Sequence, residues 1–175
     1  MFRALLFLML FSFSSITMAL SYTVEITEAE LQQQVTAMMP IEKKQLFFTV
    51  KFSNPEIDLL ESSNKIGIFT HINLDSQLGL KGKGRAKIIG SLSYDSKTSA
   101  FYFKNSKIDT LEIDKVSQKD TEQIKGLVEV MGNKILAIHP IYKLKDSDLK
   151  QKMAKAVLQS VSVKNNKLFL TLNVL

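Results

Sequence analysis

The sequence contains no cysteine and no tryptophan, and it has only three prolines and two histidines among 175 residues. The lack of cysteine excludes disulfides, thiol catalysis and every cysteine-based metal site. It also excludes a lipid anchor attached to an N-terminal cysteine. Beyond the first two dozen residues, no apolar run is long enough for a membrane-spanning helix. With 45% hydrophobic residues, these absences favour a soluble globular domain.

Recognisable catalytic and metal-binding motifs are also missing. His71 and His139 stand in no metal-ligand spacing, so we interpret them as structural or exposed side chains. Ser147 and Lys150 fit the S-x-x-K pattern, but without its companion motifs a helix N-terminus explains them better. The glycine-rich stretch 79–84 matches neither the dinucleotide-binding nor the P-loop pattern. We therefore expect no catalytic residue, no metal and no cofactor, and we do not expect an enzyme.

The N-terminal segment has the organisation of a secretory signal peptide. Arg3 is its only charge, an apolar run follows over residues 4–13, and small and polar residues lead to Ala19. This run is shorter than the roughly 20 residues that a spanning helix needs. We expect cleavage after Ala19, so that residues 1–19 are the signal peptide and residues 20–175 form a single domain. An uncleaved anchor is the alternative.

Removal of the signal peptide changes the charge only slightly. Without Arg3, the remaining 156 residues (175 − 19) carry 22 basic and 17 acidic side chains, a net charge of +5. Such an excess suits an anionic surface, but it is too diffuse to indicate nucleic acid. We expect no nucleic-acid partner for an exported protein and no membrane span after processing.

Hydrophobic periodicity predicts a short strand and a helix, followed by antiparallel strands. The strand covers residues 22–26, and the helix begins at the capping box of Thr27 and Glu30 and ends before Pro40. A β region with a bulge or bend at Pro55 follows. Its first apolar face is formed by Leu46, Phe48, Val50 and Phe52. The next strand carries its apolar residues at even positions: Ile66, Ile68, Ile72, Leu74, Leu78 and Leu80.

The second half of the chain changes from strands to helices and back. We expect turns at 79–84 and 95–98, and a return strand to about Ile113. From Ser117 a long amphipathic helix runs to His139. Its apolar stripe consists of Ile124, Leu127, Val128, Met131, Ile135 and Ile138. A second helix begins near residues 146–148, and its inward residues are Leu149, Met153, Ala156 and Val157. A hairpin with its turn at 165–166 closes the chain.

This order of elements predicts an α+β fold with about four antiparallel strands before the long helix. The apolar stripe of the long helix needs a partner surface, and the apolar face of the sheet is the largest one available.

Five stretches, taken in order, resemble the YceB-like family of bacterial periplasmic lipoproteins, a domain family without an assigned function. They are YTVEITEAELQQQV, INLDSQLGL, AFYFKNSKIDTLEI, HPIYKLKD and VSVKNNKLFLTL. The resemblance implies a fold similar to one half of the tubular, BPI-like lipid-binding superfamily. In that fold a strongly curved antiparallel sheet wraps around a long helix, and the groove between them can hold acyl chains. The family carries a lipidated cysteine that this chain lacks, so a freely diffusing periplasmic protein is implied.

Two sets of residues are candidates for binding. The first would line an apolar groove between sheet and long helix, and an ordinary packed core is the alternative. This set is Phe48, Phe52, Phe101, Phe103, Leu127, Val128 and Met131. The second set alternates with small residues in KGKGRAK and would contact a lipid head group or an anionic partner. A charged edge strand that prevents edge-to-edge pairing is its alternative. This set is Lys81, Lys83, Arg85 and Lys87.

The leading hypothesis is a soluble periplasmic protein that binds an apolar or amphipathic ligand, above all a lipid, in the groove between sheet and helix. The alternative is a periplasmic protein-interaction module that has a closed core and uses the basic strand as its contact face.

Overall fold

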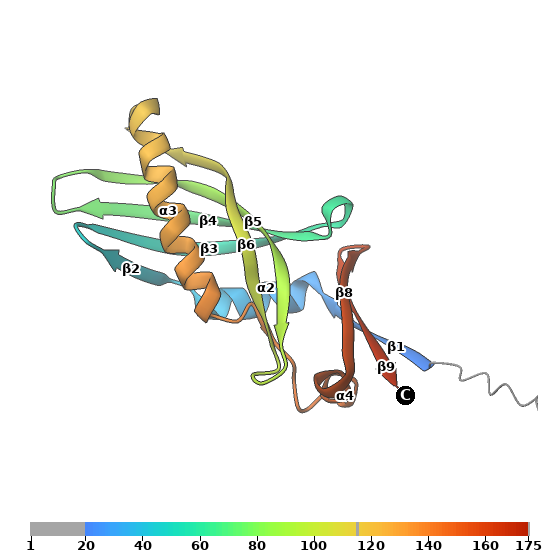
Figure 1. Cartoon of the computed structure of the whole chain (residues 1–175). Coiled ribbons are helices and arrows are strands. Elements are labelled where there is room, and N and C mark those ends of the chain that lie inside the picture. The colour runs from blue at the N-terminus through green and yellow to red at the C-terminus, as the bar shows by residue number, and fades with distance from the viewer. Residues whose placement is uncertain (1–19, 115, 175) are drawn as a thin grey trace, which may run out of the picture.

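The computed structural model describes residues 20–114 and 116–174, so the predicted signal peptide lies outside the described residues. It is a mixed α+β fold dominated by antiparallel strands, as the sequence predicts (Figure 1). The elements in chain order are β1 (Leu20–Thr27), α2 (Glu28–Met38), β2 (Ile41–Gln45), β3 (Phe48–Leu60), η2 (Glu61–Ser63), β4 (Lys65–Ser76), β5 (Lys81–Asp95), β6 (Ala100–Ile113), α3 (Gln118–Ile138), β7 (Tyr142–Lys143), α4 (Leu149–Val157), β8 (Leu158–Lys164) and β9 (Lys167–Val174).

The strands form two antiparallel sheets. The larger one has the order β2-β3-β4-β5-β6-β7 and remains open, with β2 and β7 at its edges. Five of its strands precede α3, compared with about four predicted, and β7 follows α3. The sequence did not reveal β2 because IEKKQ is mostly polar, nor β7 because it is only two residues long. The smaller sheet has the order β1-β9-β8 and joins the two ends of the described chain.

Helix α3 lies across one face of the six-stranded sheet and packs against β6 and β2 (Figure 1). It begins after its N-cap Ser117, whose hydroxyl accepts a hydrogen bond from the Asp120 amide, and it ends at the cap His139. Its buried apolar side chains are Ile124, Val128, Met131, Ile135 and Leu136. Ile138 is 64% exposed, so its predicted place in the buried stripe is wrong. It lies in the last turn, beyond the buried contacts of Ile135.

The inner face of the sheet, which α3 covers, follows the predicted alternation over most of its length. Val50, Phe52, Ile57 and Leu59 are buried in β3, and the register shifts between Ser53 and Glu56, which confirms the bulge. All even-numbered residues of β4, from Ile66 to Ser76, are buried.

The alternation fails at two turns. Leu46 lies in the β2–β3 turn and is 85% exposed, and Leu78 lies in the β4–β5 turn and is 75% exposed. Both were predicted to continue a buried face. Strand periodicity cannot apply to a residue at which the chain reverses direction.

The glycine-rich stretch is also different from the prediction. The turn occupies residues 77–80 and is closed by the hydrogen bond from the Ser76 amide to the Leu80 carbonyl oxygen. Gly82 and Gly84 lie within β5. A Cβ on Gly84 would be 1.8 Å from the carbonyl oxygen of Glu112, and one on Gly82 would be 2.6 Å from Ile113. These glycines therefore allow β6 to approach the inner face of β5 closely.

Helix α4 turns a different face inward than predicted. Leu149 is 73% exposed and Met153 is 45% exposed, whereas Gln151 and Ala154 are buried. The side-chain oxygen of Gln151 accepts hydrogen bonds from the Tyr142 hydroxyl at 3.2 Å and from the Lys145 amide at 2.9 Å. A satisfied polar side chain thus takes a position that an apolar stripe would assign to leucine or methionine. The other two predicted inward residues, Ala156 and Val157, lie outside the described side chains.

The two sheets are linked by the loop between β3 and β4. The side-chain oxygen of Asn64 accepts a hydrogen bond from the Val163 amide at 2.6 Å, and Glu61 accepts one from the Asn165 amide at 3.0 Å. The side-chain amide of Asn64 therefore bonds to the edge of β8 in the way that the backbone of a neighbouring strand would.

Candidate functional site

The predicted apolar set lies in the layer between the six-stranded sheet and α3. Phe52, Phe101, Phe103, Val128 and Met131 are at most 3% exposed and belong to one continuous core. The remaining two residues of the set, Phe48 and Leu127, are half-buried.

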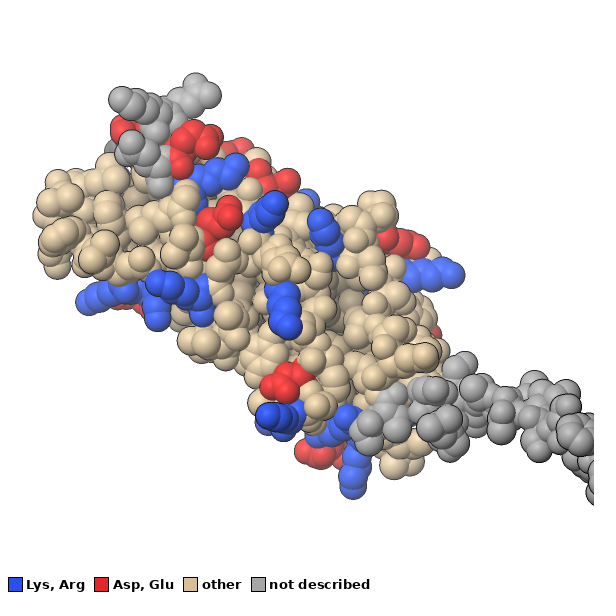
Figure 2. Space-filling view, viewed as in Figure 1, with Lys and Arg blue, Asp and Glu red and all other residues tan. Residues whose placement is uncertain are grey.

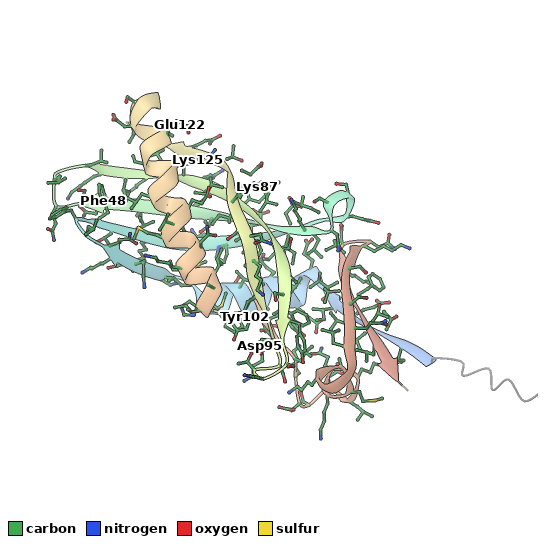
Figure 3. All side chains as sticks on the ribbon, viewed as in Figure 1. Phe48, Lys87, Asp95, Tyr102, Glu122 and Lys125 are labelled. Atoms are coloured by element: carbon green, nitrogen blue, oxygen red, sulfur yellow. The ribbon has the colours of Figure 1, made fainter. Side chains whose placement is uncertain are left out.

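Half-buried apolar side chains gather at one end of this layer, near the β2–β3 and β4–β5 turns. Phe48 opens β3 opposite Ser76, and Leu80 ends the β4–β5 turn. Ile113 and Val116 lie beside Gly82. Figure 3 shows Phe48 at this end, whereas Tyr102 and Asp95 lie at the opposite end of the sheet.

A hollow of about 490 Å³ lies at the same end. It is lined by Asn73, Leu74, Asp75, Lys81, Gly82, Lys83 and Asp114. Lys81 lies 3.8 Å from Asp75, and both side chains are mostly exposed, so water screens this pair strongly. The hollow therefore combines apolar atoms of Leu74 with two predicted basic residues.

The basic set projects from the outer face of the sheet, opposite to α3. Lys81, Lys83 and Arg85 are exposed, whereas the inward neighbour Ala86 is buried. The apolar and basic sets thus lie on opposite faces, and only Lys81 and Lys83 reach the end where apolar side chains are accessible.

Strand β5 is not an edge strand, because it pairs with β4 on one side and, from Gly84 onward, with β6 on the other. The interpretation of its charges as protection against edge-to-edge pairing is therefore wrong for Arg85 and Lys87, whereas Lys81 and Lys83 precede the first pair with β6. The edge strand β2 carries that kind of sequence, with Glu42, Lys43 and Lys44 in succession.

The four basic residues have different surroundings. Lys87 is held by Asp58 at 3.0 Å and lies 4.6 Å above the ring of Phe69, so its charge is already engaged. In contrast, neither Lys83 nor Arg85 forms an ion pair within the described part of the chain. These two cations are the ones most available to an anionic ligand or partner.

Two further hollows on the outer face share His71 and Arg85. One, of about 330 Å³, adds Asn54, Glu56, Phe69 and Thr70, and the other, of about 290 Å³, adds Lys83, Gly84, Glu112 and Asp114. Sequence reasoning missed them because their residues come from β3, β4, β5 and β6. Only the strand register shows that Arg85 lies between His71 and Glu112.

A larger hollow of about 680 Å³ lies at the opposite end of the sheet. Its lining includes Tyr94, Asp95, Tyr102 and Ile138. The Asp95 carboxylate is used by the turn itself, since it accepts hydrogen bonds from the Lys97 amide and the Thr98 hydroxyl. No candidate from the sequence other than Phe103 lines this hollow.

The resolved shifts in pKa lie outside these hollows, where α2 meets the segment before α4. Burial acts to raise the pKa of Glu30, but hydrogen bonds from Thr27 and Lys145 outweigh it, so that the pKa is lowered. The hydrogen bond to Glu30 raises the pKa of Lys145. Burial raises the pKa of Tyr142. The Glu30–Lys145 pair thus ties helix α2 to the segment before α4, and the Tyr142 hydroxyl bonds to Gln151 of α4.

Within residues 20–114 and 116–174, no three acidic or histidine side chains come close enough together to hold a metal ion. None of the described helices combines the length and the apolar character needed to cross a bilayer.

A family model described as "Protein of unknown function (DUF1439)" matches residues 26–167, which is most of the chain. No curated protein matches the chain by sequence.

Proposed function

The chain belongs to the DUF1439 family of proteins of unknown function, and from this premise we propose that it is an exported, non-enzymatic binding protein for an amphipathic anionic lipid. The lipid chain would lie between α3 and the six-stranded sheet, and the head group would contact Lys81 and Lys83. The observation that carries the proposal is the hollow at the β4–β5 turn. It combines these two lysines with Leu74 at the end of the layer where apolar side chains are half-buried.

Entry of a lipid chain requires that α3 separate from the sheet at this end. Among the described side chains, the hydrogen bonds from α3 to the sheet come from residues 129–134: Glu129 accepts from the Ile108 amide, Asn133 pairs with Ser106, and Lys134 donates to Gln45. The N-terminal half of α3 is therefore held by apolar packing around Ile124, Leu127 and Val128. Apolar contacts can be exchanged for contacts with an acyl chain at little cost.

The energy of binding would come mainly from burial. Removal of an acyl chain from water is favourable by about 0.8 kcal/mol per methylene, so a partly buried chain gives useful affinity. The phenylalanines and Met131 of the predicted groove would repack around it. The resemblance to YceB-like lipoproteins supports the same reading, since the implied tubular lipid-binding fold holds acyl chains between a curved sheet and a long helix.

The test is a native mass spectrum of the protein purified from the periplasm of a bacterium that expresses the full-length gene. A denaturing spectrum of the same sample gives the mature N-terminus, which tests the predicted cleavage after Ala19. We expect an added mass of one lipid that is lost on denaturation. The double substitution of Lys81 and Lys83 to alanine should lower lipid occupancy and shift it toward neutral lipids. Substitution of the exposed pair Lys104 and Lys107 is the matched control.

A bare native mass, also after incubation with membrane extracts, would refute the lipid proposal. The protein-interaction module would then be the better reading. Its specific support is the outer face, where Phe69 is 40% exposed beside the two hollows that share His71 and Arg85. In that case Arg85→Glu should abolish capture of a periplasmic partner and leave lipid content unchanged.

A further inference from the structure

The turns β2–β3 and β4–β5 carry the most exposed large apolar residues of the six-stranded sheet. Leu46 is 85% exposed, Phe47 is 54% exposed and Leu78 is 75% exposed. The two turns are neighbours, because the Gln77 amide donates a hydrogen bond of 3.0 Å to the carbonyl oxygen of Phe47. We call these three residues the apolar tip. In Figure 1 both turns lie at the left end of the molecule, and Figure 2 shows uncharged atoms over that end.

The backbone at Leu46 adds a second observation. Seven non-glycine residues in the described part of the chain have a positive φ: five asparagines, Ser99 and Leu46. Asparagine tolerates this left-handed conformation, whereas leucine is sterically destabilised in it. Since the Leu46 side chain is almost fully exposed, packing within the fold does not offset that penalty. Such a position is better explained by a contact outside the molecule than by folding.

The surroundings of the apolar tip are basic. The strand ends that bear the two turns, residues 41–51 and 73–83, contain five lysines and two acidic residues, a net charge of +3 (5 − 2). Lys44, Lys51, Lys81 and Lys83 are exposed. In Figure 2, blue side chains lie directly beneath the uncharged left end. Protruding leucine and phenylalanine side chains with lysines behind them fit the boundary of an anionic bilayer, where apolar groups enter the acyl region and lysines meet phosphates.

We propose that the apolar tip inserts into the surface of an anionic membrane and docks the protein there. A convex tip formed by two turns offers little area to a flat protein partner, but it suits a deformable lipid surface. The proposal does not require that the protein extract a lipid. If both proposals hold, docking places the hollow with Lys81 and Lys83 at the membrane, since Lys81 directly follows the β4–β5 turn.

The first experiment measures co-sedimentation of the purified periplasmic protein with phosphatidylcholine vesicles, with and without phosphatidylglycerol. We expect binding that needs the anionic lipid and weakens with salt. Each loss of a tip side chain should lower the partition coefficient by about tenfold, so Phe47→Ser with Leu78→Ser should lower it about a hundredfold. The matched control is Ile138→Ser with Leu149→Ser, which removes two equally exposed apolar side chains elsewhere and should change it less than about twofold.

The second experiment uses Leu46→Gly. Glycine adopts the left-handed conformation without penalty, so this variant should unfold at a temperature about 2–4 °C higher. Its binding to anionic vesicles should nevertheless be about tenfold weaker. A gain in stability together with lost binding would separate the role of Leu46 at the membrane from its role in the fold.

The proposal is overturned if the wild-type protein ignores anionic vesicles, or if tip and control variants bind them equally. It is also overturned if the tip substitutions convert a dimer into a monomer and leave vesicle binding unchanged, because the tip would then be a contact between two copies.

A native mass spectrum of the tip variant distinguishes this proposal from the lipid-carrier proposal. Lipid retained by a variant that no longer binds vesicles supports docking, and a wild-type protein that binds vesicles but carries no lipid supports docking alone.

Discussion

Large apolar residues are buried at one end of the six-stranded sheet and exposed at the other. At the end where β6 begins, Phe101, Ile141, Tyr142 and Leu144 are at most 2% exposed. At the other end, Leu46, Phe47 and Leu78 are mostly in solvent, and the neighbouring Phe48 and Leu80 are only half-buried. We call the first the sealed end and the second the tip end.

The sealed end is closed by backbone and amide hydrogen bonds from distant segments. The Ile141 amide donates to the Phe101 carbonyl oxygen at 2.8 Å, and the Leu144 amide donates to Ser99 at 3.0 Å. The Gln34 side chain accepts from the Lys143 amide at 3.0 Å, which ties α2 to the edge strand β7. No described segment covers the tip end in the same way. We infer that Phe101, Ile141, Tyr142 and Leu144 stabilise the fold, although a hollow of about 680 Å³ lies near them at the same end. The exposed side chains of the tip end are available for binding.

The largest expected effect comes from removing a large side chain at the sealed end. Phe101→Ala should lower the free energy of unfolding by about 3–5 kcal/mol, since it leaves a cavity in the packed core. Phe47→Ala at the tip end should change it by less than about 0.5 kcal/mol. Urea unfolding followed by circular dichroism measures both. Equal losses for the two variants would mean that the tip end is also part of the stable core, contrary to the comparison.

An intermediate effect is expected in β5, the strand that runs from the tip end to the sealed end. Gly84→Ala should cost about 3 kcal/mol, because its Cβ would lie 1.8 Å from the Glu112 carbonyl oxygen and the backbone of β6 must move. The control is Gly126→Ala in α3, where the new Cβ meets no atom within 4 Å other than its chain neighbours and the backbone of the helix itself. It should raise stability by about 0.5–1 kcal/mol through helix propensity. If Gly84→Ala left the free energy of unfolding unchanged in the same urea titration, β6 would not approach β5 so closely.

The smallest effect concerns a polar fastening of the sealed end. Lys145 donates a 3.0 Å hydrogen bond to Glu30, whose pKa is lowered in the folded protein. A lowered carboxyl pKa contributes stability above its ordinary value of about 4.3, and that contribution is lost as the pH falls through the folded pKa. The free energy of unfolding of the wild type should therefore exceed that of Glu30→Gln by less than about 1 kcal/mol near neutral pH. This difference should vanish in acid.

Thermal unfolding of both proteins at a series of pH values measures this difference. The pKa of Lys145 is raised in the folded protein. Its contribution to stability is therefore complete below the ordinary lysine pKa of about 10.4, and it is lost as the pH rises through the folded pKa. The double variant with Lys145→Met should show that the two effects are not additive. A difference between wild type and Glu30→Gln that stays constant from neutral pH into strong acid would contradict this account.

Much of the fold could be predicted because its signals are local. The capping box at Thr27, the bulge near Pro55 and the helix cap at Ser117 each depend on residues a few positions apart. The candidate site was harder, because a periodic pattern assigns side chains to a face but does not say what covers it. Lys81, Lys83 and Arg85 were correctly placed together on one face of a strand, yet their neighbours Asp75, His71 and Glu112 come from other strands.

The sequence by itself determined the α+β class, the antiparallel strands and the limits of α3, since alternation, caps and turn residues act through the backbone of adjacent residues. Only the tertiary structure decided that β5 is central and that Gln151 replaces a leucine or methionine in the inward face of α4. It also decided that the two apolar turns lie side by side at an uncovered end of the sheet. Strand order and exposure depend on contacts between residues far apart in the chain, which a pattern of neighbouring residues does not contain.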